Sequence, residues 1–263
     1  MNDAAVTRTR DEHGIVVLRL QDDRDKNALS APVVEQLTTE LAAVGADELA
    51  KVCIVCGLDD VFCSGGHKDM LRELAAGRVA ASDIMLSRAM LEVPIPTIGA
   101  MAGHAVGGGL VLGLCCDVVL MARESRYGCS FMNMGFTPGM GTTRLLSLAV
   151  GEYVAAEMMY GGQFFRGRHF ERCGGINYVL PRSDVEPKAT ELAQRIAEKP
   201  RHALELLKRS LSLSKRTAFE TARTTESLMH EISFAHPETA ALIEEQYAGA
   251  LDAPASTGRD QDA

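Results

Sequence analysis

A run of consecutive glycines constrains this chain more than any other feature of its sequence. An apolar, strand-like run ends at Met101, and three glycines follow at 107–109, before an apolar helical stretch at 110–116. Glycine has no Cβ, so the backbone of such a strand-to-helix turn can approach a ligand closely. The first N–H groups of the helix lack intrahelical partners and carry the positive end of its dipole. The turn is therefore suited to hold a negative charge that develops on an oxygen, or it is a tight turn that only requires small residues.

The overall composition is that of a soluble globular protein. The 263 residues are 46% hydrophobic and 24% charged, enough for one large domain or a domain with an appended segment. The net charge of −8 and the lack of a basic run argue against nucleic acid as a partner. No run of about twenty apolar residues could span a membrane, and the first residues do not resemble a signal peptide. These features predict a cytoplasmic protein that binds neither nucleic acid nor membrane.

Seven cysteines raise the question of a metal site. Cys53 and Cys56 have the spacing of a metal-binding pair, but they lie in an apolar run typical of a buried strand. No second pair follows at the spacing of a zinc site. We therefore expect no metal site, and reduced, buried thiols that agree with a cytoplasmic location.

Apolar periodicity predicts alternating strands and helices over the first two thirds of the chain, and helices alone afterwards. The predicted strands lie at 6–10, 15–20, 52–56, 94–101, 118–122 and 178–180. One helix is predicted to begin near residue 31. Further predicted helices span 68–76, 80–91, 142–150, 152–160, 169–173, 188–198, 201–214, 218–232 and 237–247. This pattern predicts an α/β core at 1–184, a helical C-terminal region at 185–248 and a disordered tail at 249–263.

Two glycine turns carry a family resemblance. Phe-Cys-Ser-Gly-Gly at 62–66 and Gly-His-Ala-Val-Gly-Gly-Gly at 103–109 resemble the two oxyanion-hole segments of the crotonase (enoyl-CoA hydratase/isomerase) superfamily. Further matches to the family pattern are Asn-Ala-Leu at 27–29, Asp117, Pro-Gly-Met-Gly at 138–141 and Arg144-Leu145. The resemblance extends from about residue 6 to residue 247.

The resemblance implies a β-β-α superhelix with a helical trimerisation region at its C-terminal end, assembled as a homotrimer or a hexamer. It also implies that the backbone N–H groups of Gly66 and Gly108 form an oxyanion hole for a thioester carbonyl. The thioester itself accepts the electrons of the reaction, so no cofactor is expected apart from the carrier of the acyl group.

The two catalytic glutamates of the hydratases are missing from this chain. The corresponding positions hold Val111 and Phe131, and neither side chain can transfer a proton. Water addition requires such groups, so the sequence argues against hydration and predicts an apolar pocket. Val111 and Phe131 are expected to line this pocket, together with Tyr127 and Asn133.

Lys68 and His230 are the candidate catalytic side chains. These two residues, with the segment 131–139 between them, resemble the decarboxylases of polyketide β-branching cassettes, the second enoyl-CoA hydratase homologues. That resemblance implies catalytic roles for both residues in converting a 3-methylglutaconyl thioester on an acyl carrier protein to a 3-methylcrotonyl-type thioester. On their own, Lys68 could be a solvated lysine at a helix start, and His230 could cap a helix or satisfy a core hydrogen bond.

Several alternatives remain open at the level of sequence. An enoyl thioester double-bond isomerase would use the same oxyanion hole with His230 alone, and a hydratase or a non-catalytic acyl-binding protein of the same fold would need neither residue. The carrier is an acyl carrier protein or coenzyme A. Since a carrier protein is acidic, it would require a local basic patch, for which Arg72, Arg78 and Arg88 are the candidates.

Overall fold

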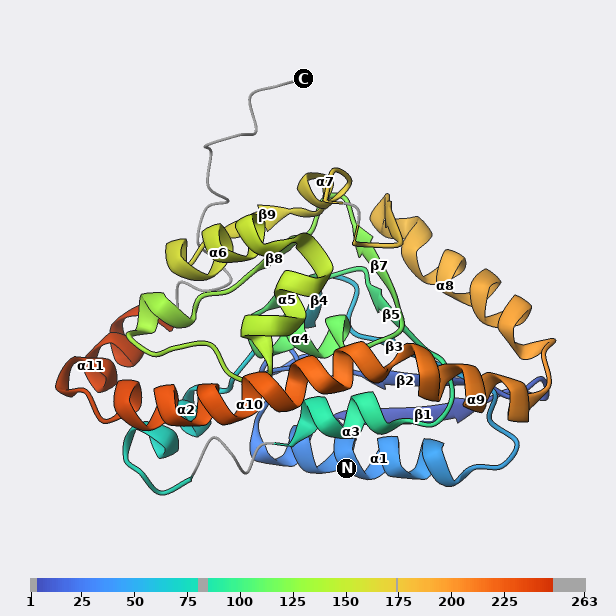
Figure 1. Ribbon diagram of the computed structural model, residues 1–263, viewed down its shortest axis with the longest axis horizontal. Coiled ribbons are helices and arrows are strands. Elements are labelled where there is room, and N and C mark those ends of the chain that lie inside the picture. The colour runs from blue at the N-terminus through green and yellow to red at the C-terminus, as the bar shows by residue number, and fades with distance from the viewer. Residues whose placement is uncertain (1–3, 80–84, 174, 248–263) are drawn as a thin grey trace.

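The described part of the molecule contains two β-sheets, and the larger one has six strands (Figure 1). The computed structural model describes residues 4–79, 85–173 and 175–247. In this sheet the strand order is β1-β2-β3-β5-β7-β10, and all neighbours are parallel except the antiparallel pair β1–β2. Its strands are β1 (Val6–Arg10), β2 (Ile15–Leu20), β3 (Val52–Cys56), β5 (Thr97–Met101), β7 (Val118–Ala122) and β10 (Tyr178–Leu180). Every one of them lies in a segment predicted to be a strand.

A second, four-stranded sheet has the order β4-β6-β8-β9. Its strands are β4 (Val61–Cys63), β6 (His104–Val106), β8 (Arg126–Gly128) and β9 (Phe164–Arg166). The chain leaves β3 for β4, β5 for β6 and β7 for β8, so three successive passes through the large sheet are each followed by one through the small sheet. This spiral confirms the predicted α/β fold, the β-β-α superhelix. The four strands of the small sheet were not predicted, whereas the equally short β10 was.

Both faces of the large sheet are covered. In β3, Cys53 and Val55 face the main core, whereas Val52, Ile54 and Cys56 face helix α8 (Arg182–Ala197). This double burial explains why the strands read as continuous apolar runs. Helix α8 begins six residues before the predicted start, and Pro187 lies inside it. The predicted boundary at 184/185 therefore falls within a helix of the core.

The remaining helices pack against the two sheets or lie in the C-terminal region. They are α1 (Ala31–Ala46), α2 (Lys68–Ala75), α3 (Leu86–Glu92), α4 (Gly108–Leu114), the 3-10 helix η2 (Phe131–Met134), α5 (Thr142–Val150), α6 (Glu152–Gly161), α7 (Gly167–Phe170), α9 (Arg201–Leu211), α10 (Leu213–Phe234) and α11 (Pro237–Gln246). The predicted helix at 80–91 is described only from residue 85 onwards, and the predicted tail at 249–263 lies outside the described residues. Within the described ranges, no helix combines the length and apolar character needed to cross a membrane.

Helices α9 and α10 hold helix α4 from its C-terminal end. Lys215 of α10 donates hydrogen bonds to the carbonyls of Leu114 and Cys116, where the negative end of the α4 dipole lies. Lys208 of α9 is buried and pairs with Asp117, 2.6 Å away, whose carboxylate also accepts from Thr97. The N-terminus of α4, which carries the glycine turn, is therefore anchored through its other end.

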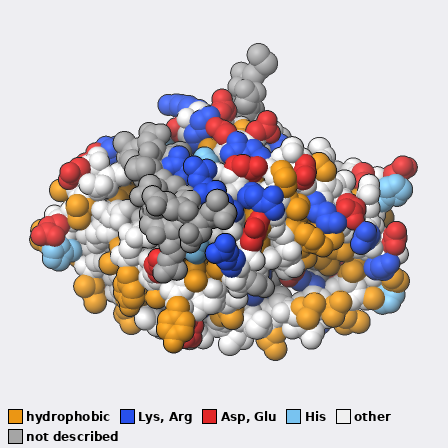
Figure 2. Space-filling view, turned by 90° about the horizontal axis from the view of Figure 1, so that it is seen from above, with side chains coloured by type: hydrophobic (Ala, Val, Ile, Leu, Met, Phe, Trp, Pro, Cys, Tyr) orange, Lys and Arg blue, Asp and Glu red, His pale blue; other side chains and the backbone are white. Residues whose placement is uncertain are grey.

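The three arginines that could supply a basic patch are each paired with a carboxylate. Arg72 pairs with Glu244, Arg78 pairs with Glu73, and Arg88 pairs with Glu220 of α10. Basic and acidic side chains also lie among one another on the face seen from above (Figure 2). Each of the three arginines therefore has an acidic partner within the chain.

Candidate active site

Each of the three glycines at 107–109 is required for a different geometric reason. Gly107 adopts a positive φ of 50°, which residues with a Cβ rarely tolerate. A Cβ on Gly108 would lie 2.7 Å from the sulfur of Met140, and a Cβ on Gly109 would lie 2.3 Å from the carbonyl oxygen of Cys63. The triple glycine thus allows a sharp turn and close packing between β4 and α4 at once.

The first glycine loop, which contains Gly65 and Gly66, is positioned by the Asn-Ala-Leu segment. The buried side-chain amide of Asn27 donates to the carbonyls of Leu20 and Phe62, over 3.1 and 3.0 Å, and so links the end of β2 to β4. The amide of Leu29 donates to the carbonyl of Gly65 over 2.7 Å. A Cβ on Gly65 would be 3.8 Å from the nitrogen of Gly108, so the two glycine loops lie side by side.

The amide groups of Gly66 and Gly108 are available to a ligand. Both residues line the same cavity, and no described residue accepts a hydrogen bond from either amide. Gly108 is the first residue of α4, so its N–H also lies at the positive end of a helix dipole. Two converging backbone donors of this kind suit an oxyanion.

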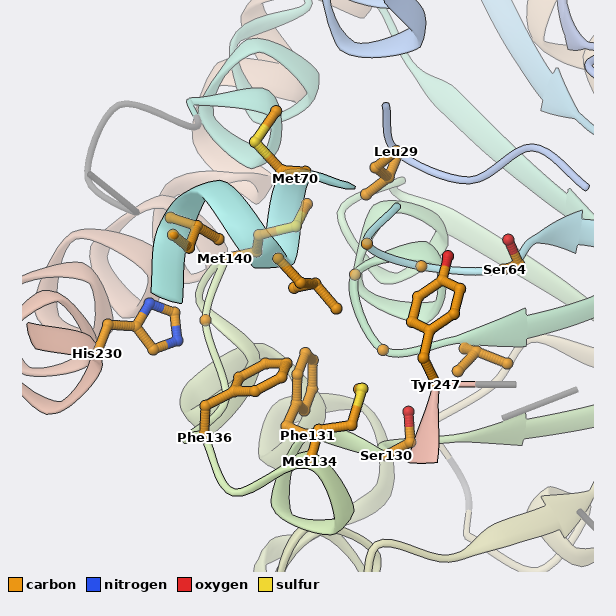
Figure 3. Close-up of a pocket in the computed structure, with 18 of the residues that line it drawn as sticks. Leu29, Ser64, Met70, Ser130, Phe131, Met134, Phe136, Met140, His230 and Tyr247 are labelled. Atoms are coloured by element: carbon orange, nitrogen blue, oxygen red, sulfur yellow. The ribbon is translucent and has the colours of Figure 1, made fainter. Parts of the chain in front are cut away.

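The cavity has a volume of about 320 Å³ and mostly apolar walls (Figure 3). Its polar side chains, among the described residues, are Glu35, Ser64, Ser130, His230 and Tyr247. His230 stands at one end, while Tyr247 and Ser64 lie at the other, across a wall that includes Phe131 and Phe136 (Figure 3). Elsewhere in the described ranges, no cluster of three or more His, Cys, Asp or Glu residues is arranged to hold a metal ion.

His230 reaches the cavity from helix α10. Its Nε2 lies 2.8 Å from the carbonyl oxygen of Thr137, and because a carbonyl only accepts, Nε2 carries the proton. Burial lowers the pKa of His230, while the hydrogen bond to Thr137 and the charge of Glu226 act in the opposite direction. With a net lowering, the ring is neutral in the free protein at neutral pH.

Lys68 is not among the residues that line the cavity, but it lies beside Tyr247, which is. It is the first residue of α2, and its Nζ lies 2.9 Å from a carboxylate oxygen of Glu244 and 5.9 Å from the ring centroid of Tyr247. The side chain therefore reaches from α2 to helix α11. The direction of the Lys68 side chain could not be predicted from its place near Gly66, because it depends on where helix α11 packs.

Three of the four residues predicted to line the pocket are not among the residues that line this cavity. Val111 is fully buried in α4 and faces the main core. Tyr127 is also fully buried, and its hydroxyl donates to the carbonyl of Met101 over 2.6 Å. Asn133 donates to the carbonyl of Gly162 over 3.0 Å, outside the cavity. Phe131 is the one that lines it.

Sequence reasoning missed several lining residues. Tyr247 comes from the end of α11, and Met70 and Leu74 come from one face of α2. Phe136 and Phe234 stack with their ring centroids 4.6 Å apart and extend the apolar wall beside His230. The only signal in the sequence is that Phe234 follows His230 by four residues, which places both on one face of a helix.

Comparison with known proteins agrees with this geometry. The family model described as enoyl-CoA hydratase/isomerase matches residues 10–246. Bacillaene synthase decarboxylase PksI of Bacillus subtilis is 37% identical over 236 residues, which cover 90% of this chain and 95% of that protein.

Solved structures of decarboxylases are also similar. The ECH2 decarboxylase domain of CurF from Lyngbya majuscula has a TM-score of 0.86 and 36% identity, covering 93% of this chain and 100% of that one. A structure from a dehydratase/decarboxylase enzyme couple involved in polyketide β-branching has a TM-score of 0.89 and 37% identity, covering 92% and 99%. The family match spans nearly the whole chain and includes both glycine loops, so this protein belongs to the enoyl-CoA hydratase/isomerase (crotonase) family.

Proposed function

We propose that this protein decarboxylates a 3-methylglutaconyl-type thioester to a 3-methylcrotonyl-type thioester during polyketide β-branching. The observation that carries the proposal is an apolar cavity that joins two free glycine amides to His230, with Phe131 where a hydratase has a catalytic glutamate. The similarity to PksI and to the CurF decarboxylase domain supports the same reaction class.

The proposed reaction breaks one carbon–carbon bond and moves its electron pair to the thioester. The bond between the substrate carboxylate and the γ-carbon breaks, CO2 leaves, and the electron pair flows through the conjugated system to the thioester oxygen. The resulting dienolate is held by the amides of Gly66 and Gly108. One proton then adds to a carbon of the dienolate, which restores a neutral enoyl thioester.

His230 is the proposed proton donor. The ring is neutral in the free protein, and an anionic substrate in the cavity favours its protonated form, because opposite charges stabilise each other in an apolar environment. The imidazolium gives its proton to the dienolate and takes another from solvent. Apolar walls such as Phe136 withhold water from the substrate carboxylate, which favours its loss as CO2.

The carrier and the assembly are part of the proposal. We infer that the acyl group arrives as a phosphopantetheine thioester on an acyl carrier protein, with coenzyme A as the alternative carrier, and that no further cofactor takes part. Exposed leucines and isoleucine on α9 and α10 support self-association as a homotrimer or a dimer of trimers. Seven cysteines without a disulfide among them support a cytoplasmic location.

The direct test is intact-protein mass spectrometry of a 3-methylglutaconyl-loaded carrier protein after incubation with the enzyme. We expect a mass loss of one CO2. A change by one water would indicate a hydratase, and an unchanged mass would leave an isomerase or a non-catalytic acyl-binding protein, so either result would overturn the proposal. Proton NMR of the released acyl chain separates the isomerase from the binding protein.

A further inference from the structure

A buried carboxylate lies one helical turn from His230 and does not touch the cavity. Glu226 is 2% exposed and belongs to the same helix, α10. Its two carboxylate oxygens accept hydrogen bonds from the amide of Gly141 over 2.7 Å, and from the amide and hydroxyl of Thr143 over 2.8 and 2.7 Å. Burying a carboxylate costs free energy unless it is well paired, and these three donors supply the pairing.

The groups held by Glu226 belong to the turn on which His230 rests. Gly141 ends the Pro-Gly-Met-Gly turn and precedes α5, whose N-terminus the carboxylate caps. A Cβ on Gly139, in the same turn, would lie 2.2 Å from Cε1 of His230, so the ring packs directly against the turn backbone. Any shift of the turn relative to α10 would therefore displace the ring.

Strain in this turn makes the outside support necessary. Met140 adopts a positive φ of 62°, although it is not a glycine, and its side chain lines the cavity. Such a conformation is strained and persists only where the surroundings enforce it. The hydroxyl of Ser87 donates to the carbonyl of Met140 over 2.8 Å, and Glu226 holds the next residue from the other side.

Two further contacts tie α10 to the start of the same turn. The amide of Thr137 donates to the hydroxyl of Ser233 over 3.3 Å, and the carbonyl of Thr137 accepts from His230. Residues Glu226, His230 and Ser233 thus lie along one face of α10 and grip the segment 137–143 at three points. Glu226 is the only one of the three that brings a negative charge.

We propose that Glu226 is a positioning residue for His230, fixing the turn and helix α10 in the register that presents the ring to the substrate. The inference rests on the proposed function for the role of His230 in catalysis. The orientation and charge environment of the ring, however, are measured without substrate. A residue that only capped α5 would stabilise the fold and leave the ring unaffected.

The test compares Glu226→Gln with Glu231→Gln. Glutamine keeps the shape but removes the charge, and it presents an amide donor where two backbone donors need an acceptor. Glu231 is exposed on the same helix, next to His230, so its substitution is a matched control for charge. Thr143→Ala removes one hydrogen bond of the cap and keeps the Glu226 charge, which provides a milder variant if Glu226→Gln folds poorly.

The first readout is an NMR titration of His230 in each purified full-length variant. We expect Glu226→Gln to lower the pKa of His230 further and to shift the Nε2–H resonance, while Glu231→Gln leaves both unchanged. In the decarboxylase assay we expect kcat to fall on the order of 10- to 100-fold with little change in KM, since a misplaced group impairs chemistry rather than binding. In Thr143→Ala we expect a smaller shift of the same Nε2–H resonance.

Two outcomes decide the inference separately from the proposed function. If the His230 signals of Glu226→Gln and Thr143→Ala match the wild type and only their melting temperatures fall, Glu226 is a helix cap and the inference is overturned. If the His230 signals shift as expected but the wild type releases no CO2, the positioning role stands and the proposed function fails.

Discussion

At the scale of single residues, His230 carries most of the proposed chemistry. It is one of the few polar side chains in a largely apolar cavity, its ring is held by the carbonyl of Thr137, and burial lowers its pKa. Tyr247 stands at the opposite end of the cavity beside Ser64 (Figure 3). In the proposed reaction, the thioester of the substrate binds near the glycine amides and its carboxylate points toward His230.

Substitution of His230 by glutamine should remove the proposed proton donor and preserve the size of the side chain. We expect the decarboxylation rate to fall by about 10²- to 10⁴-fold, the usual contribution of a general acid. Substitution of the exposed His13 by glutamine serves as the control. Single-turnover mass spectrometry of the loaded carrier protein measures both rates, and equal rates would exclude His230 as the donor.

The pKa of His230 also predicts a pH dependence of stability. Because burial lowers the pKa of the folded protein, the unfolded chain binds a proton at a pH where the folded chain does not. Stability from this residue is therefore present above the unfolded pKa of about 6.5 and is lost as the pH falls toward the folded value. His104, whose pKa burial also lowers, adds to the same trend.

We expect the melting temperature to fall more steeply in the wild type than in His230→Gln over this acidic interval. The remaining slope of the variant reports His104 and other groups. Calorimetry at several pH values above and below the unfolded pKa of about 6.5 measures this dependence. Parallel curves for the two proteins would show that the ring is not held neutral by the fold.

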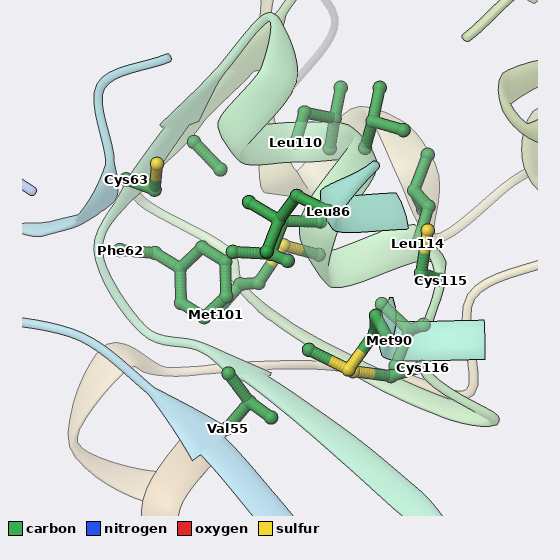
Figure 4. Packing of buried hydrophobic residues seen from close by; sticks show 14 of the residues in the cluster. Val55, Phe62, Cys63, Leu86, Met90, Met101, Leu110, Leu114, Cys115 and Cys116 are labelled. Carbon is green, nitrogen blue, oxygen red and sulfur yellow. The ribbon is translucent and has the colours of Figure 1, made fainter. Parts of the chain in front are cut away.

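At the scale of elements, α4 and α10 organise the site together. The glycine turn begins α4, and Leu110 of this helix packs with Phe62 and Met101 in the buried cluster between the sheets (Figure 4). Helix α10 fixes the far end of α4 through Lys215 and places His230 in the cavity. The two glycine amides and the imidazole are thus held by elements more than a hundred residues apart in sequence.

Helices α2 and α11 are joined by ion pairs that include Lys68. Glu244 of α11 accepts from Lys68 and bidentately from Arg72, and these two cations lower the pKa of Glu244 to about 2. Because this pKa is lowered, the attraction is present above the usual carboxyl pKa and is lost as the pH falls through about 2. These contacts place Lys68 against α11 and Tyr247, so we propose that it also affects the site by holding this helix.

Lys68→Ala and Arg72→Ala should consequently behave alike. Each removes one cation from Glu244, so we expect a decrease in activity of less than about 10-fold for both, because exposed ion pairs contribute little. The same decarboxylation assay with His230→Gln alongside gives the scale. A loss in Lys68→Ala as large as that of His230→Gln, with Arg72→Ala near the wild type, would restore a catalytic role for Lys68.

At the scale of the whole molecule, the C-terminal helices cover the active site and expose an apolar surface. Leu206, Leu211 and Ile232 on α9 and α10 are 63%, 67% and 76% exposed. Large exposed aliphatic side chains on adjacent helices are typical of an association surface. Since α10 also carries His230, association through this face would stabilise the helix that builds the site.

Light scattering after gel filtration tests this association. We expect a mass of three or six times the 28.3 kDa of one chain. Leu211→Glu should shift the protein toward the monomer, because a charge would be buried in the interface. Tyr160→Glu, at another exposed position, on α6, is the control. A wild-type monomer would contradict the proposed assembly.

The sequence by itself determined the fold class, the strands of the large sheet and the glycine turns. Apolar runs such as 52–56 have a strong pattern because both of their faces are buried, and glycine is required wherever a Cβ would meet backbone, as at Gly109. These requirements are local, so they can be read from neighbouring residues.

Only the tertiary structure decided which side chains enter the cavity. Val111 and Lys68 lie within a few residues of the glycine turns, yet one faces the core and the other pairs with Glu244. Tyr247 and His230 reach the cavity from distant helices. The direction of a side chain depends on which element packs against it. The packing elements are often far apart in the sequence, so no local pattern shows that they will meet.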